Sequence, residues 1–148
     1  MSDKRKEFLA SALLGVVVAV DFWVTVLGRE TQANSVMFLR PFHFILNLQN
    51  CFRWSGLTGN TLGNIVLFIP LGVLLPCVWK WARAWYRTAI VAFTFSLSLE
   101  VIQLLTRKGC FDLDDLFLNT LGAIVGYGVI ALIKKVFRFK LEKASLHI

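Results

Sequence analysis

Long apolar stretches dominate the chain, and polar residues gather between them. Four stretches are apolar over nearly their whole length, namely residues 8–27, 61–79, 88–106 and 116–133. A helix needs about 20 mostly apolar residues to cross the hydrocarbon core of a bilayer, and each stretch is close to that length. The pattern predicts an all-α integral membrane protein, a four-transmembrane-helix bundle that forms a single domain over residues 1–148.

The segment between the first two predicted helices is not an ordinary polar loop. Residues 37–52 read MFLRPFHFILNLQNCF, which is apolar and aromatic but too short and too interrupted to span a membrane. We expect an interfacial or re-entrant segment there, lying at the outer surface. The first apolar stretch has the basic start of a signal peptide, but Asp21 interrupts it and no small-x-small cleavage site follows. We therefore expect an uncleaved membrane anchor.

The composition supports a membrane protein and indicates its orientation. Of the 148 residues, 57% are hydrophobic and 17% are charged, and a soluble domain of this size has too little interior to hide so much apolar surface. The net charge of +7 does not indicate nucleic-acid binding, because the basic residues concentrate before the first stretch, at 80–87 and after the fourth stretch. The positive-inside rule then places both termini and the 80–87 loop in the cytoplasm, with the basic residues near anionic membrane lipids.

Polar residues interrupt the last two apolar stretches at helical spacing, so that each set shares one helical face. In chain order they are Ser96, Glu100, Gln103 and Arg107, then Asp112, Asp115, Asn119, Gly122 and Gly126. A short outer connection joins these two helices, so we expect them to lie antiparallel with their polar faces meeting in the outer half of the membrane. The glycines of the fourth helix are expected to let the third helix approach closely.

The sequence therefore predicts an outward-facing polar pocket within the membrane. Its expected ligand-binding residues are Arg40, Asn64, Glu100, Gln103, Arg107, Asp112, Asp115 and Asn119. Ionisable residues cost roughly 2.5–3.5 kcal/mol each at the centre of a spanning helix, so those that are kept usually face the bundle interior or water. The arginines can hold a phosphate or carboxylate through paired hydrogen bonds. Glu100 is the candidate acid or base, because its apolar surroundings would desolvate it; Asp21 has no assigned role.

Each polar residue also has a structural interpretation. One aspartate between residues 112 and 115 is expected to be the N-cap of the fourth helix. Glu100 can pair with Arg107, and Asn119 can bond a neighbouring helix. The neighbouring carboxylates nevertheless repel one another, so a cation should compensate them, and Arg40, Arg107, Lys108, a metal or a cationic ligand could do so.

The cysteines predict neither a metal site nor a cofactor. They lack paired spacing and neighbouring histidines, and the chain holds no P-loop or nucleophile motif. Cys51 and Cys110 both lie outside in the expected topology and could form a disulfide. Free buried cysteines are the alternative.

Four motifs along the chain carry a family resemblance. They are LRPF at 39–42, GNIVLFIPLGVLLP at 63–76, LEVIQ at 99–103 and DLDDLFLNTLGAIVGY at 112–127. Their order and spacing resemble the VanZ-like family. The resemblance implies a bacterial cytoplasmic-membrane protein linked to glycopeptide resistance, the founding type being associated with protection against teicoplanin more than vancomycin. It implies a polar signature at Asn64, Glu100, Gln103, Asp112, Asp115, Asn119 and Gly122, with Arg107 and Lys108 further from the first aspartate than is usual in the family.

Three functions fit these observations. The leading hypothesis is a binding protein whose pocket holds a lipoglycopeptide antibiotic, or the lipid-linked cell-wall precursor that the drug targets. In it Arg40 would contact an anionic group and the aspartates would hold the polar head. The alternative is an enzyme, an acid/base-assisted transferase or hydrolase acting on an envelope lipid or cell-wall precursor. The third is a structural partner of envelope complexes; a transporter fits less well, because the inner half of the bundle lacks matching polar residues.

Overall fold

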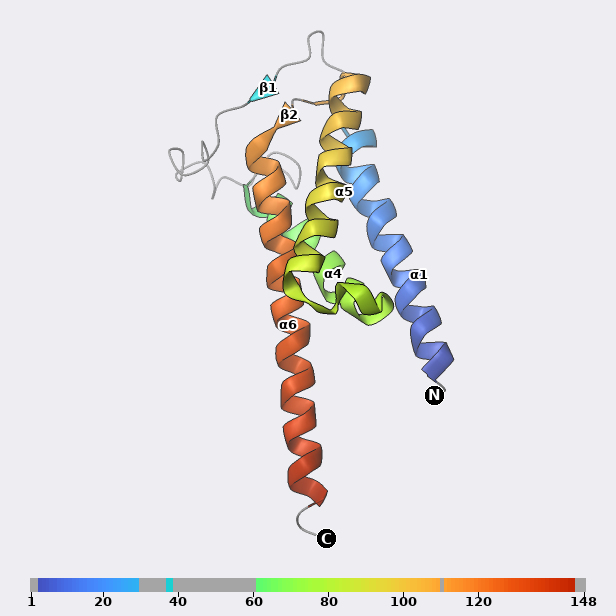
Figure 1. Cartoon of the computed structure of the whole chain (residues 1–148). Coiled ribbons are helices and arrows are strands. Elements are labelled where there is room, and N and C mark those ends of the chain that lie inside the picture. Colours follow the sequence, from blue (N-terminus) through green and yellow to red (C-terminus); the bar gives the residue numbers. More distant parts are fainter. Residues whose placement is uncertain (1–2, 30–36, 39–60, 110, 146–148) are drawn as a thin grey trace.

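Long helices run side by side through most of the chain (Figure 1). The computed structural model describes residues 3–29, 37–38, 61–109 and 111–145. In chain order the elements are α1 (Asp3–Phe22), the π-helical η1 (Trp23–Leu27), β1 (Met37–Phe38), α4 (Thr61–Val78), the 3-10 turn η2 (Lys80–Arg83), α5 (Trp85–Thr106), β2 (Phe111–Asp112) and α6 (Leu113–Ser145). The predicted all-α membrane fold is confirmed.

Three of the described helices are long and apolar enough to cross a membrane. They cover Lys4–Leu27, Trp85–Thr106 and Leu113–Phe139. The helix α4 is apolar over Leu62–Val78, but at ~1.5 Å per residue this stretch rises only about 26 Å, slightly less than the ~30 Å hydrocarbon core. The prediction of four spanning helices is therefore confirmed for three of them, and α4 lies at the lower limit of the required length.

Small residues let α4 and α6 approach closely. A Cβ atom added at Gly122 or Gly126 of α6 would overlap the backbone of Ile65 or Ile69 on α4, and one at Gly72 of α4 would overlap the α6 backbone. The prediction that these glycines admit the third helix, α5, was therefore wrong, because the backbone they meet belongs to α4. The spacing of small residues indicates which face of a helix is closely packed, but it does not identify the neighbour.

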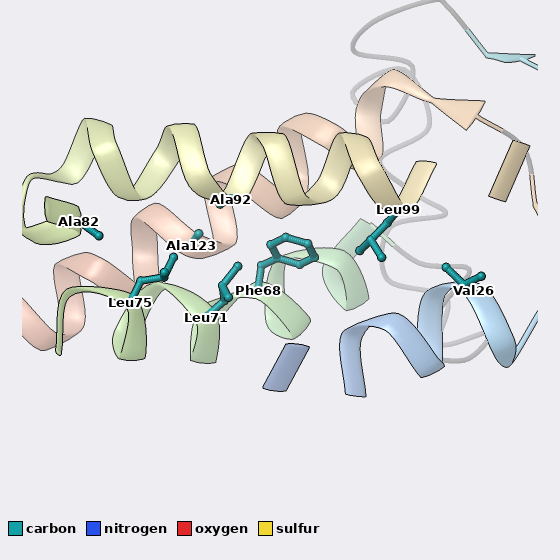
Figure 2. Packing of buried hydrophobic residues seen from close by; sticks show 8 residues of the cluster. All are labelled: Val26, Phe68, Leu71, Leu75, Ala82, Ala92, Leu99 and Ala123. Carbon is teal, nitrogen blue, oxygen red and sulfur yellow. The ribbon is translucent and has the colours of Figure 1, made fainter. Parts of the chain in front are cut away.

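A small apolar core joins the helices. Its buried members, drawn in Figure 2, are Val26, Phe68, Leu71, Leu75, Ala82, Ala92, Leu99 and Ala123. Phe68 is fully buried between α4 and α5, where its ring centroid lies 5.8 Å from that of Phe95. Many other large apolar side chains, such as Leu105 and Phe137, are exposed on the outside of the bundle. Exposed apolar surface on this scale suits contact with lipid rather than water.

The end of the bundle near the α5–α6 connection carries a short parallel strand pair, and we call it the β end (Figure 1). Met37 of β1 lies opposite Phe111 of β2, and Phe38 lies opposite Asp112. Of the predicted interfacial segment 37–52, the structure describes only β1. The remainder of that segment lies outside the described residues, as do Arg40, Cys51 and Cys110.

The opposite end carries η2, and we call it the basic end. Its basic residues are Lys80, Arg83, Arg87, Lys134 and Lys135. The start of α1 and the last turns of α6 lie toward the same end (Figure 1). The helix α6 continues past the predicted boundary at residue 133 as far as Ser145, so its last turns extend beyond the neighbouring helices.

Candidate functional site

Asp112 forms the start of α6. Its Oδ1 atom accepts the backbone N–H of Asp114 at 2.9 Å, which is the bond made by an N-cap side chain. Its own backbone N–H donates to Oε2 of Glu100 at 2.9 Å. In a capping box the residue three positions after the N-cap bonds this N–H. Because Glu100 does so here, the carboxylate of Asp115 is left for other contacts, and the expected N-cap role belongs to Asp112.

Asp115 and Arg29 together connect four segments of the chain. The carboxylate of Asp115 accepts a hydrogen bond from Nδ2 of Asn64 on α4, and its Oδ2 lies 3.8 Å from Nη2 of Arg29, just after η1. Nη1 of Arg29 donates to Oε1 of Gln103 on α5 at 3.4 Å. The side chains of Arg29 and Asp115 are 19% and 17% exposed, so the ion pair is largely removed from solvent.

Gln103 makes a hydrogen bond to the backbone of η1, at the end of the first spanning helix. Its Nε2 donates to the backbone carbonyl of Thr25 at 2.9 Å, and the last carbonyls of a helix lack partners within that helix. Gly109 lies beside the contact between the side chains of Arg29 and Gln103. A Cβ atom at Gly109 would meet Nη1 of Arg29 at 3.0 Å and Oε1 of Gln103 at 3.1 Å, so a larger residue would crowd this pair of side chains.

The polar contacts continue deeper into the bundle through Asn119. Its Nδ2 donates to Oγ of Ser96 on α5 at 2.8 Å. The prediction that the polar faces of the third and fourth helices meet is confirmed by this bond and by the one between Asp112 and Glu100. Among the described residues, Oδ1 of Asn119 and Oδ2 of Asp21 are buried without a hydrogen-bond partner. Buried polar atoms normally have one, so these two atoms are available to water or a ligand.

We call the side chains that make these polar contacts the polar cluster. It consists of Arg29, Asn64, Ser96, Glu100, Gln103, Asp112, Asp115 and Asn119. It contains six of the eight predicted binding residues. Arg107 is exposed at the end of α5, and Arg40 lies outside the described residues.

The sequence-based prediction missed Arg29. It is the cation that faces Asp115, and it also lies within electrostatic range of Glu100. Its position was a usable signal, because it directly follows the first apolar stretch while Gln103 comes near the end of the third. These two helices run parallel, so residues at their C-terminal ends lie at the same depth. Among the described residues, no group of three or more His, Cys, Asp or Glu side chains could hold a metal ion.

Arg107 is part of the C-terminal cap of α5. Its φ of 56° and ψ of 26° are left-handed, and it is the one described non-glycine residue with positive φ. The N–H of Lys108 bonds the carbonyl of Gln103 at 3.0 Å, and that of Arg107 lies 3.4 Å from the carbonyl of Leu104. This is a Schellman motif, in which glycine normally takes the left-handed position.

Replacing Arg107 with glycine is expected to stabilise the protein by about 0.5–1 kcal/mol, because glycine adopts the left-handed conformation without a steric penalty. The thermal unfolding midpoint of purified protein in detergent measures the change. Lys108→Gly is the matched control, since it removes the same charge without relieving a positive φ, and it should bring no gain. A lower midpoint for Arg107→Gly would show instead that the arginine side chain anchors this end of the bundle.

Comparisons with known proteins agree with the motifs. A family model described as VanZ/LLP1 matches residues 8–134, which include the whole polar cluster. The chain is similar to Protein VanZ of Enterococcus faecium, with 27% identity over 129 residues that cover 87% of this chain and 78% of that protein. No solved structure matches.

Proposed function

Because the chain belongs to the VanZ/LLP1 family, we propose that it lowers susceptibility to lipoglycopeptide antibiotics such as teicoplanin. In this proposal the polar cluster binds the drug, or the lipid-linked cell-wall precursor that the drug targets. The supporting observation is that the buried polar residues lie toward one end of the bundle. Among the described residues in the half of the bundle toward the basic end, Thr88 is the one buried polar side chain. Its hydroxyl already donates to the carbonyl of Ala82. A one-sided cluster suits a molecule that is met at one membrane face and is not carried across.

The β end faces outward in this proposal, and the protein lies in the bacterial cytoplasmic membrane with both termini in the cytoplasm. The residues of the basic end support this orientation, because basic segments stay in the cytoplasm. Along α6 the rise from Asp115 to Lys134 is about 29 Å, close to the ~30 Å thickness of the hydrocarbon core. Asp115 would then lie at the depth of the outer headgroups, where a lipid-tailed drug or precursor is anchored.

The ion pair supplies groups for both signs of charge on such a ligand. At 3.8 Å the contact between Arg29 and Asp115 is longer than a tight charge-assisted hydrogen bond, so a ligand can compete for either partner. A phosphate or carboxylate would take Arg29, and an ammonium group would take Asp115. Oδ1 of Asn119 would accept a hydrogen bond from the ligand deeper in the site. Arg40 keeps its proposed contact with an anionic group.

The experiment that tests this function compares two drugs. A sensitive Gram-positive host expressing the chain should show a several-fold higher inhibitory concentration of teicoplanin, and little change for vancomycin, which has no lipid tail. Membrane levels of the protein are measured in parallel. No protection from either drug at good expression would contradict the proposal, and equal protection from both would remove the role of the lipid tail.

The alternative function, an acid/base enzyme, is supported by Glu100. Its buried carboxyl group lies beside those of Asp112 and Asp115. We expect Glu100→Gln to keep most of the teicoplanin protection, since the amide oxygen can still accept the N–H of Asp112. Glu100→Leu is the control for that bond. It leaves a part-buried N–H without its acceptor, at a cost of about 1–3 kcal/mol, and should lower the amount of folded protein. Complete loss of protection in Glu100→Gln at normal protein level would favour acid/base catalysis over binding.

A further inference from the structure

A second site lies at the basic end, where η2 meets α6. A pocket of about 170 Å³ opens there. It is lined by Pro76, Arg83, Tyr127, Ile130, Ala131 and Lys134. Two of these side chains are cationic and three are apolar, and no carboxylate lines the pocket. A pocket with this lining matches an anionic group attached to an apolar tail.

The backbone that carries Arg83 is fixed from two sides. The hydroxyl of Tyr127 donates to the carbonyl of Arg83 at 2.7 Å, which ties η2 to α6. The hydroxyl of Thr88 donates to the carbonyl of Ala82 at 2.7 Å, and Ala82 itself is fully buried. Two consecutive carbonyls of η2 are therefore anchored, while the side chain of Arg83 is exposed beside Lys134.

The charged residues around the pocket are basic. The sequence holds no aspartate or glutamate between Glu30 and Glu100, or between Asp115 and Glu142. Lys80, Lys135 and Arg87 add further positive charge at this end. Such a concentration of cations repels itself unless anions compensate it.

Aromatic side chains place the pocket at headgroup depth. Trp79, Trp81 and Trp85 are exposed beside it, and tryptophan favours the interface between membrane and water. The guanidinium of Arg87 lies 5.2 Å from the centroid of the Trp81 ring and 5.5 Å from that of Tyr86. This arginine is therefore held against the aromatic rings, whereas Arg83 lines the pocket.

We propose that this pocket binds the headgroup phosphate of an anionic glycerophospholipid. The planar guanidinium of Arg83 and the ammonium of Lys134 bind phosphate oxygens, and the acyl chains follow the apolar surface at Ile130. Basic pockets between spanning helices at the cytoplasmic face suit such headgroups. The ligand is a membrane lipid rather than soluble phosphate, because the pocket lies among exposed tryptophans. This site is separate from the polar cluster and does not depend on the function proposed for that cluster.

The test measures the thermal unfolding midpoint of the purified full-length chain in detergent during titration with phosphatidylglycerol or phosphatidylcholine. We expect stabilisation by phosphatidylglycerol alone. Arg83→Gln/Lys134→Gln should weaken the apparent affinity by roughly tenfold or more, whereas the matched control Lys80→Gln/Lys135→Gln, which removes the same charge outside the pocket, should keep it. Ala131→Leu fills the pocket without changing its charge and should also lose the stabilisation, which keeps the test decisive if the pocket double variant does not fold.

Two results would overturn the inference. Equal weakening in the pocket and control double variants, with Ala131→Leu unaffected, would mean that the lipid is attracted by the overall charge of this end. Equal stabilisation by inorganic phosphate in place of lipid would identify a soluble phosphate ligand instead.

Discussion

Gly122→Leu is expected to remove folded protein from the membrane. A Cβ atom at this position would already overlap the backbone carbonyl of Ile65, and leucine adds three further carbons. The helices cannot separate locally, because Gly126 one turn further along α6, and Gly72 of α4 against Ala123, make equally close backbone contacts. Overpacking of a well-packed interface typically costs about 1–3 kcal/mol. Here backbone meets backbone, so the cost should exceed that range and approach the total stability of a domain, ~5–15 kcal/mol.

The same helix supplies a matched control. Gly128 also lies on α6, but a Cβ atom there would meet nothing within 4 Å, so Gly128→Leu should fold normally. The amount of monodisperse protein recovered from membranes in mild detergent distinguishes the two variants. Normal recovery of Gly122→Leu would mean that α4 and α6 do not pack at this distance in the membrane.

Arg29→Met is expected to destabilise the protein by about 2 kcal/mol, less than the ~3–5 kcal/mol for breaking a fully buried ion pair. The cost arises because the carboxyl group of Asp115 would lose the guanidinium that faces it while Glu100 and Asp112 remain close. The second substitution Asp115→Asn should recover most of the loss, since it removes the carboxyl group that has lost its partner. Contacting residues typically show a coupling of about 0.5–3 kcal/mol.

The unfolding midpoints of the wild type, both single variants and the double variant give this coupling. Arg107→Met is the control, because it removes a basic side chain that is exposed at the same end. It should change the midpoint little and should show no coupling with Asp115→Asn. If Arg29→Met and Asp115→Asn simply add, the two side chains do not interact, and the proposed centre of the polar cluster is wrong.

The sequence predicted the helices well, because a bilayer requires long apolar stretches. The predicted 88–106 stretch lies within α5, which ends at Thr106, and the fourth begins close to the start of α6 at Leu113. The polar cluster was predicted largely for the same reason. Buried polar residues are expensive in a membrane, so Glu100 and Asn119 are conspicuous within apolar stretches.

Two features required the three-dimensional arrangement. The sequence position of Arg29 indicates its depth in the membrane, but basic residues are common at membrane borders, so that position did not distinguish an interior arginine from a surface one. The partner of Gly122 depends on which helix lies against that face of α6. The short connection to α5 favoured α5 as that partner, whereas the structure places α4 there. Chain connectivity determines which helices are neighbours more reliably than it determines which pair packs most closely.

The most direct test of the central claim is the teicoplanin susceptibility of a host expressing the double variant Arg29→Met/Asp115→Asn. This variant keeps the net charge of the cluster, and its membrane level should be close to that of the wild type. If the polar cluster is the working site, the double variant is folded and gives no protection, while Arg107→Met at the same level protects as the wild type does. Full protection by the folded double variant would contradict the account, because the groups proposed to hold the ligand would then be dispensable.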